Sequence, residues 1–220
     1  KGADEEVEKA ANEEIALQAS RESIVLLKND KNILPLDASG IQKIAVCGPN
    51  ADEHSYALTH YGPLAVEVTS VLKGIQEKMK GKAEVLYTKG CDLVDTNWPE
   101  SELIDYPLTD EEQKEIEKAV DQTKQADVAV VVLGGGQRTC GENKSRSSLD
   151  LPGRQLDLLK AVAATGKPVV LVLINGRPLS INWADKFVPA IVEAWYPGSK
   201  GGKAVADVLF GEYNPGGKLT

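Results

Sequence analysis

The amino-acid sequence predicts an α/β protein, an α/β sandwich built on an open, mostly parallel five-stranded sheet with helices on both faces. Two observations predict this fold. Short apolar runs alternate with longer segments in which apolar residues recur at helical spacing. The runs "VAVVVLGG" and "PVVLVLING" are apolar almost throughout and rich in valine, as strands buried on both faces of a parallel sheet are. We expect a sixth strand to lie beyond the end of the chain.

The first half of the chain contains two predicted helices and two predicted strands. Apolar residues recur at helical spacing from Asp4 to about Leu27, and "NDKNILPLD" ends that helix with polar residues and a proline. Lys43 to Pro49 is a short apolar strand that closes on Gly-Pro. A second helix follows over 68–81, and "AEVLYT" is the second strand.

The second half begins with a polar stretch from Gly90 to about Leu108, which we interpret as a loop. Thr109 follows as an N-cap, because acidic residues fill the turn after it. The remaining predicted elements are, in order, helix 109–126, strand 127–135, helix 152–166, strand 168–176, strand 190–198 and helix 200–211. Strands and helices therefore alternate along most of the chain, as the crossovers of a parallel sheet require.

The domain organisation is simple. Neither an internal repeat nor a low-complexity linker divides the chain, and its 220 residues can bury a core without disulfide support. We predict an N-terminal helix and connector over residues 1–40, and one sandwich domain over residues 41–220.

Composition and charge exclude two classes of partner. The net charge of −8 argues against nucleic acid, because neutralising phosphates requires clustered lysine and arginine. The chain has no stretch near the roughly 20 apolar residues that span a bilayer, so no membrane partner is predicted. The opening "KGADEEVEKA" is a charged helical start and not a signal peptide. The signal of an exported protein would lie upstream, and the compartment stays open.

The predicted topology assigns ligand binding to one edge of the sheet. In open α/β sheets ligands bind outside the carboxyl ends of the strands. The loops after Val46, Thr88, Leu133, Ile174 and Trp195 therefore share one rim. The loop after Leu133 is the longest that directly follows a strongly apolar strand.

That loop begins like a phosphate-binding loop and then departs from the pattern G-x-x-x-x-G-K-S/T. Gly136 and Gly141 have the required spacing, but Glu142 stands where the lysine should be. A carboxylate there opposes phosphate binding and suits a general acid or base, provided that its surroundings tune its pKa. The alternative is a solvated loop glutamate.

Basic residues lie on both sides of Glu142, namely Arg138, Lys144 and Arg146. They are candidates for holding substrate hydroxyls or for orienting the acid. The equal alternative is that they form a solvated basic loop with no role in a site. Trp98, in the polar stretch, is a candidate for stacking on a sugar ring. A glycosidase needs two carboxylates, and no spacing argument names the second one in this chain.

No cofactor and no metal site is predicted. His54, His60 and the cysteines Cys47, Cys91 and Cys140 fall on the predicted rim, but no C-x-x-C or i, i+4 pair supports a metal cluster. Sequence spacing leaves open whether Cys91 and Cys140 form a disulfide.

Six segments together resemble the C-terminal α/β sandwich domain of glycoside hydrolase family 3. They occur in the order of the family and cover most of residues 19–219: "ASRESIVLLKNDKNILPL", "IAVCGPNAD", "GENKSRSSLDLPGRQ", "GKPVVLVLINGRPLSINWA", "AIVEAWYPGSKGGKAVADVLFG" and "YNPGGKL". Each is a loose pattern by itself, and the ordered set is specific.

The resemblance implies an enzyme that hydrolyses β-glucosides, β-xylosides or related β-linked oligosaccharides with retention of configuration. It also implies a partner, a barrel domain of the same protein that lies before this chain and carries an aspartate nucleophile. In many members a loop of the sandwich domain supplies the acid/base glutamate, which matches Glu142. Arg146 matches an arginine of the same segment and would steer the loop or touch sugar. Without the barrel, we expect this fragment alone to be inactive.

Two other functions compete with this interpretation. The domain could be a non-catalytic scaffold that shapes the leaving-group subsites while the acid comes from elsewhere. It could also be a phosphate- or nucleotide-binding α/β protein. Glu142 argues against this, because it stands where a phosphate-binding loop has its lysine.

Overall fold

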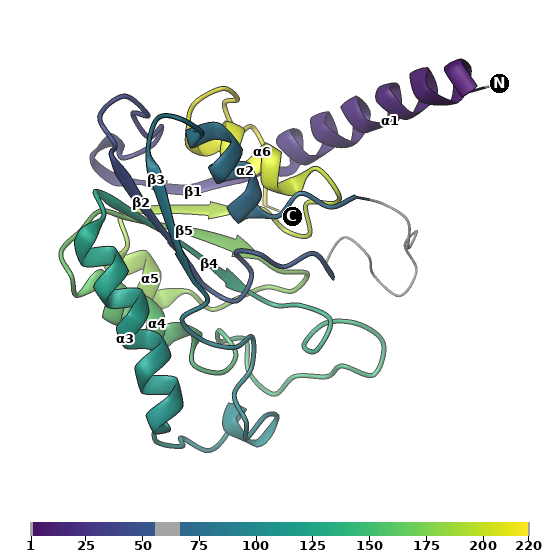
Figure 1. Cartoon of the computed structure of the whole chain (residues 1–220). Helices are drawn as coiled ribbons and strands as arrows, with labels where there is room; N and C mark the ends of the chain where they lie inside the picture. The colour runs from purple at the N-terminus through teal and green to yellow at the C-terminus, as the bar shows by residue number, and fades with distance from the viewer. Residues whose placement is uncertain (1, 56–66, 220) are drawn as a thin grey trace.

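The computed structural model describes residues 2–55 and 67–219. Its centre is a six-stranded sheet with the strand order β1-β6-β5-β4-β2-β3 (Figure 1). Every neighbouring pair from β6 to β3 is parallel, and β1 pairs antiparallel with β6 at the edge. The prediction of a mostly parallel α/β sandwich is confirmed.

The strands are short, with four to seven residues each, and the helices vary more in length. The strands are β1 (Val25–Asn29), β2 (Lys43–Cys47), β3 (Glu84–Thr88), β4 (Val128–Gly134), β5 (Val169–Ile174) and β6 (Ala190–Glu193). The α-helices are α1 (Gly2–Ser23), α2 (Val71–Met79), α3 (Asp110–Gln125), α4 (Gln155–Ala163), α5 (Asn182–Phe187) and α6 (Gly201–Leu209). Two 3-10 turns are η1 (Asp30–Asn32) and η3 (Glu100–Glu102).

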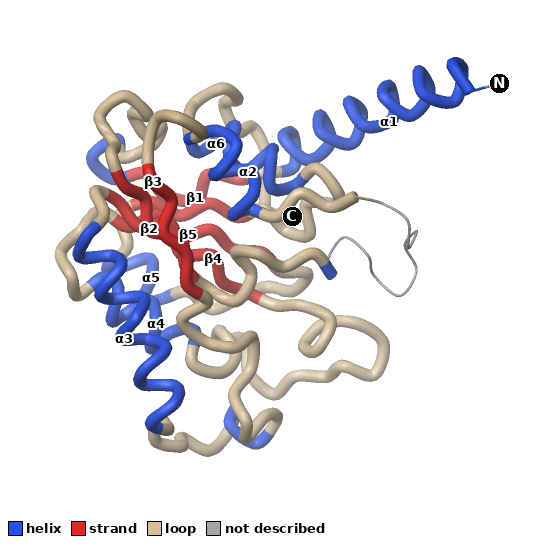
Figure 2. Tube along the Cα trace, in the orientation of Figure 1, coloured by secondary structure: helices blue, strands red, loops and turns tan. Residues whose placement is uncertain are grey.

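Helices cover both faces of the sheet, and each face has its own core. The α1, α2 and α6 helices lie on one face, and α3, α4 and α5 on the other (Figure 2). Side chains alternate along a strand, so Val130 and Val132 of β4 enter the first core while Val131 and Leu133 enter the second. Because the central strands are buried on both sides, they must be apolar at every position, which explains their valine-rich sequences.

The structure corrects the expected number of strands, because the sheet has six strands within the described residues. The first helix ends at Ser23 and not near Leu27, and Val25–Asn29 forms β1. Leu26 continues the helical spacing of the preceding apolar residues, but it pairs with Val192 of β6. A strand of five residues is too short to distinguish a period of 2 from one of 3.6, so only its distant partner reveals it.

The α5 helix was also not predicted. It lies between β5 and β6, two parallel neighbours, and a parallel pair needs a crossover connection that passes over a face of the sheet. Its six residues are too few to show a helical repeat in the sequence.

Three helices of the first face converge on one buried carboxylate. Asp207 of α6 has no exposed surface. It accepts hydrogen bonds from Arg21 of α1 (Nη2, 2.7 Å), from Lys78 of α2 (3.2 Å) and from Lys203 of its own helix (3.2 Å). Burial raises the pKa of Asp207, but the hydrogen bonds from these cations outweigh it and hold the pKa below its ordinary value. The carboxylate therefore joins α1, α2 and α6 as an ion.

The α3 helix begins as the sequence predicts. Thr109 accepts a hydrogen bond from the Glu112 amide, and the Glu112 side chain accepts one from the Thr109 amide, which completes a capping box. Among residues 2–55 and 67–219, no helix has the length and apolar character that crossing a membrane requires.

Candidate functional site

The carboxyl ends of the parallel strands meet at one edge of the sheet, where hydrogen bonds join the loops that follow them. Asn50, after β2, donates to the carbonyl oxygens of Gly135 (2.9 Å) and Ile174 (3.1 Å). The Asn175 amide, after β5, donates to the Trp195 carbonyl oxygen, after β6 (3.1 Å). The loops after β2, β4, β5 and β6 thus form one continuous rim, as the topology predicts.

One long loop on this rim is residues 135–154, which we call the β4–α4 loop. It contains turns and bends but no helix or strand. Its two ends are held together by Gln155, whose side chain accepts from the Gly134 amide (2.7 Å) and donates to the Gly134 carbonyl oxygen (2.9 Å). The loop therefore leaves the sheet and returns to it at one point.

Glu142 lies at the corner of a β-turn within this loop. The turn is closed by a hydrogen bond from the Lys144 amide to the Gly141 carbonyl oxygen (3.2 Å). Asn143 adopts a φ of +60°, a conformation that asparagine tolerates better than most residues. Glu142 is exposed to solvent there. A carboxylate at an exposed turn corner is accessible to a ligand or to another domain.

Two of the predicted site residues, Arg146 and Trp98, contact each other. The Arg146 guanidinium lies over the Trp98 ring, 5.3 Å from its centroid. It also forms an ion pair with Glu102 of η3, and both side chains of the pair are about 95% buried, with exposures of 5% and 4%. The Ser147 amide and hydroxyl each donate to Glu102 at 2.7 Å. Arg146 therefore fastens the β4–α4 loop to the segment around η3.

The Glu102 carboxylate is ionised in this arrangement. Burial raises its pKa, but the hydrogen bonds from Ser147 and Arg146 outweigh burial, so the pKa lies below its ordinary value. Sequence reasoning missed Glu102, because it is one of several acids in a polar stretch. Its only sequence signal is an acid close to Trp98 in the loop after β3.

The other two predicted residues, Lys144 and Arg138, are exposed on the β4–α4 loop. Lys144 is two residues after Glu142, and Arg138 lies in the preceding turn. The contacts of the described residues do not join either side chain to Arg146. Both remain candidates for contact with a ligand.

A second arginine, Arg177 in the loop after β5, reaches the same turn. Its Nε donates to the Thr139 carbonyl oxygen (3.2 Å), and its Nη2 donates to the Lys144 carbonyl oxygen (2.5 Å). It therefore spans the segment that carries Glu142. The sequence signal for Arg177 was its place just beyond an apolar strand, at the carboxyl edge.

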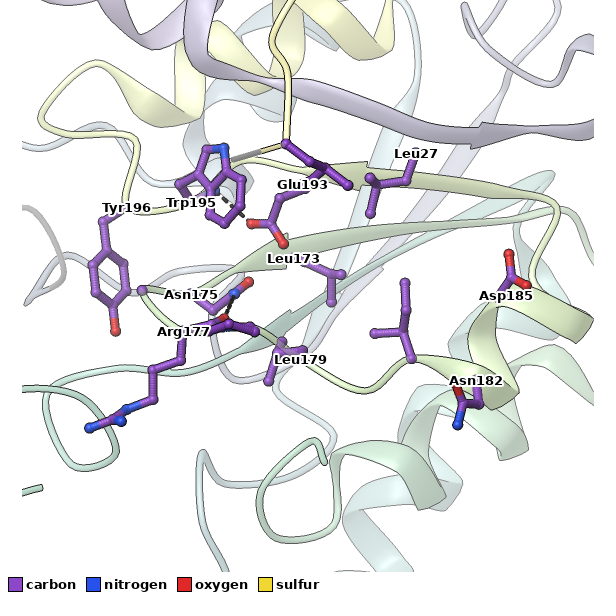
Figure 3. A pocket seen from close by; sticks show the side chains of 14 residues that line it. Leu27, Leu173, Asn175, Arg177, Leu179, Asn182, Asp185, Glu193, Trp195 and Tyr196 are labelled. Carbon is purple, nitrogen blue, oxygen red and sulfur yellow. Dashed lines mark hydrogen bonds between the residues drawn. The ribbon is translucent and has the colours of Figure 1, made fainter. Parts of the chain in front are cut away.

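Arg177 also lines a pocket of about 890 Å³ beside the loop (Figure 3). In Figure 3 its guanidinium extends away from Leu27 and Leu179, which also line the pocket. Two polar residues of the lining are buried, Asn175 and Glu193, which are 2% and 5% exposed. The Asn175 side chain donates to the Arg177 carbonyl oxygen and so orients the start of that loop.

Glu193 is the last residue of β6 and has an unusual environment. Burial raises the pKa of its carboxyl group to about 7, although it accepts a hydrogen bond from the Trp195 amide (2.8 Å). Trp195 itself has a φ of +55°, which is rare for an aromatic residue. The sequence signal for Glu193 is a single acid at the end of the apolar run "AIVE".

The cysteines are thiols, and they are not paired with one another. Cys47 and Cys91 are buried, and burial raises the pKa of the Cys47 thiol to about 12. In the described part of the chain, no group of three or more histidine, cysteine or acidic side chains is arranged to hold a metal ion. His54 is within that part, and His60 lies outside the described residues.

The sequence matches the model of the glycosyl hydrolase family 3 C-terminal domain over residues 24–220. It is 44% identical to a β-xylosidase from Formosa agariphila and 43% identical to a periplasmic β-glucosidase from Salmonella typhimurium, over 94% and 93% of this chain. The chain spans 27% of the length of each of these relatives.

Solved structures agree with this result. The fold is similar to that of a GH3 exo-β-xylosidase in complex with a xylobiose aziridine activity-based probe, with a TM-score of 0.83 and 29% identity. The similarity covers 98% of this chain and 26% of that one. With the match of the family model over nearly the whole sequence, this places the chain in the glycosyl hydrolase family 3 C-terminal domain family.

Proposed function

We propose that the whole protein is a retaining β-glycosidase and that this domain supplies its general acid/base, Glu142. The observation that carries the proposal is an exposed carboxylate at the corner of a turn in the β4–α4 loop, at the carboxyl edge of the sheet. The names of the relatives, β-xylosidase and β-glucosidase, support β-xylosides or β-glucosides as the substrate class. A nucleotide-binding function has no support from these relatives.

The proposed reaction has two steps. An aspartate on a barrel domain outside this chain attacks the anomeric carbon while Glu142 protonates the departing glycosidic oxygen. The sugar–oxygen bond breaks, and a covalent glycosyl–enzyme forms. The Glu142 carboxylate then takes a proton from water, which attacks the anomeric carbon and releases the aspartate. Glu142 ends the cycle protonated, as it began.

The neighbours of Glu142 divide into two groups in this proposal. Lys144 and Arg138 are exposed on the same loop and contact sugar hydroxyls. Arg146 and Trp98 stack on each other and act through the shape of the loop.

The test uses the intact parent enzyme with Glu142→Gly. An acid/base matters most for a poor leaving group, so hydrolysis of cellobiose should fall by about 10²- to 10⁴-fold. Cleavage of an aryl β-glucoside with a good leaving group should fall less, because its first step needs little protonation. Azide should restore turnover of the aryl substrate by attacking the glycosyl–enzyme in place of activated water.

Lys82→Gly is the matched control, because Lys82 is an exposed turn residue just before β3, at the opposite edge of the sheet, and the ratio between the two substrates should stay near that of the wild type. If Glu142→Gly lowers the hydrolysis of both substrates only slightly, the acid lies elsewhere, and the domain is a scaffold that shapes the leaving-group subsites.

A further inference from the structure

An acid/base on a loop must meet a nucleophile on a different domain, which requires an ordered loop. A misplacement of about 1 Å can cost roughly 100-fold in rate. The β4–α4 loop has twenty residues, 135–154, without helix or strand. Loops of this length tend to be conformationally heterogeneous unless side chains hold them. The question is which side chains hold the segment around Glu142.

One anchor lies on the C-terminal side of Glu142. Glu102 pairs with Arg146 and accepts two hydrogen bonds from Ser147 at 2.7 Å. The Arg146 guanidinium is further fixed by the Trp98 ring below it and by a hydrogen bond from Nη2 to the Asp150 carbonyl oxygen (2.7 Å). Because the ion pair is almost fully buried, water screens it weakly, and losing either partner leaves an unpaired buried charge.

The other anchor spans the turn itself. Arg177 donates to the carbonyl oxygens of Thr139 and Lys144, three residues before and two residues after Glu142. The planar guanidinium is always charged and presents its donors in a fixed geometry, so it sets the distance between these two carbonyl groups. Asn175, buried at the end of β5, in turn holds the Arg177 backbone.

We propose that Glu102 and Arg177 are positioning residues that hold residues 139–147 from two sides, so that Glu142 is presented to the substrate at a fixed place. This inference rests on the proposed acid/base role of Glu142. Glu102 comes from the loop after β3 and Arg177 from the loop after β5. Both anchors therefore follow strands of the sheet, and the sheet fixes the position of the turn.

The experiment compares Arg177→Gln, Glu102→Gln and Arg177→Lys with wild type in the intact parent enzyme. Arg21→Gln is the matched control, because Arg21 also bonds a buried group, Asp207, but acts between α1 and α6. The kinetic readout is kcat/KM for cellobiose against kcat/KM for an activated aryl β-glucoside. The structural readout is hydrogen exchange of the amides from 139 to 147.

For Arg177→Gln and Glu102→Gln we expect faster exchange in 139–147. We also expect about a 10- to 100-fold loss on cellobiose and a much smaller loss on the aryl substrate. Arg177→Lys should recover part of the cellobiose activity, because lysine keeps the charge and can reach one carbonyl group. Arg21→Gln should leave both the exchange in 139–147 and the substrate ratio unchanged.

Two results would overturn the proposal. One is an equal loss of kcat/KM for both substrates in Arg177→Gln and Glu102→Gln, which is the result that a general loss of folded enzyme gives. The other is loosened exchange in 139–147 with an unchanged substrate ratio, while Glu142→Gly itself shifts that ratio. If Glu142→Gly does not shift the ratio, the proposed acid/base function is wrong. The positioning role is then wrong as well, even if Arg177→Gln and Glu102→Gln make hydrogen exchange in 139–147 faster.

Discussion

Glu193 shows at the scale of one residue how burial changes the chemistry of a carboxyl group. It is 5% exposed at the end of β6, and burial raises its pKa to about 7 from an ordinary value of 4.5. Between these two pH values the folded chain keeps a proton that the unfolded chain releases. Unfolding therefore becomes easier as pH rises through this window, and the stability from the neutral form is fully present below pH 4.5.

We expect Glu193→Gln to remove this pH dependence. The variant keeps a neutral side chain that can accept from the Trp195 amide, so its free energy of unfolding should not fall between pH 5 and pH 7. The wild-type chain should lose roughly 2 kcal/mol over the same window. Denaturant unfolding of the 220-residue chain at several pH values measures the difference.

The control for this prediction is Glu117→Gln, on the exposed face of α3. It should show the same pH-dependent fall as wild type. A wild-type chain whose stability is constant from pH 5 to pH 7 would contradict the assignment of the shifted group.

The candidate site also shows at this scale what a sequence can reveal. Glu142 could be named as a candidate because it interrupts a known pattern at a fixed position after a buried strand. Glu102 and Arg177 could not, because their importance comes from partners 44 and 33 residues away along the chain. Contacts made across the sheet edge leave no periodic pattern in the sequence.

The contact between α2 and α6 is governed at the scale of elements by two glycines. A Cβ atom added at Gly74 of α2 would lie 2.1 Å from the Gly202 carbonyl oxygen, and one added at Gly202 would lie 1.9 Å from the Ser70 carbonyl oxygen. Both neighbours are backbone atoms, so the helices would have to separate. The two backbones can approach closely only because side chains are absent.

We predict that Gly74→Ala and Gly202→Ala each destabilise the chain by about 3 kcal/mol, because the clash forces the helices apart. Helix propensity alone predicts the opposite sign, since alanine is favoured over glycine in a helix by about 1 kcal/mol. Thermal or denaturant unfolding decides between the two effects.

Gly216→Ala is the matched control, because a Cβ atom there would meet nothing within 4 Å. Its effect should stay within about 0.5 kcal/mol. A Gly74→Ala chain that is as stable as the Gly216→Ala chain would show that α2 and α6 can separate at no cost.

The elements themselves were predictable in proportion to their burial. β4 and β5 are buried at every position, and their apolar sequences could be identified directly. α3 was predictable from its cap. β1 and α5 were not, because five and six residues carry too little periodicity to outweigh their neighbours.

The molecule as a whole holds one part of the proposed catalytic machinery. In the proposed mechanism the nucleophile belongs to another domain, so the 220-residue chain alone should not hydrolyse glycosides. We expect no detectable release of product from an activated aryl β-glucoside by the purified chain, under conditions in which the intact parent enzyme turns over.

Activity in the purified sample would contradict this prediction only if the 220-residue chain itself, and not a contaminating glycosidase, is its source. The Glu142→Gly chain, purified in the same way, separates the two cases. Hydrolysis by the wild-type chain that disappears in the variant would mean that the chain contains its own nucleophile.

The antiparallel pairing of β1 with β6 has a consequence for the order of folding. Val25 pairs with Glu193, so β1 is synthesised 168 residues before its partner. At typical rates of synthesis this interval is about 10 to 30 seconds. During that time the hydrogen-bonding groups of β1 have no native strand to pair with, and an unpaired strand edge invites association with other chains. β1 therefore joins the sheet only when β6 does, and the nascent domain is most vulnerable before β6 emerges.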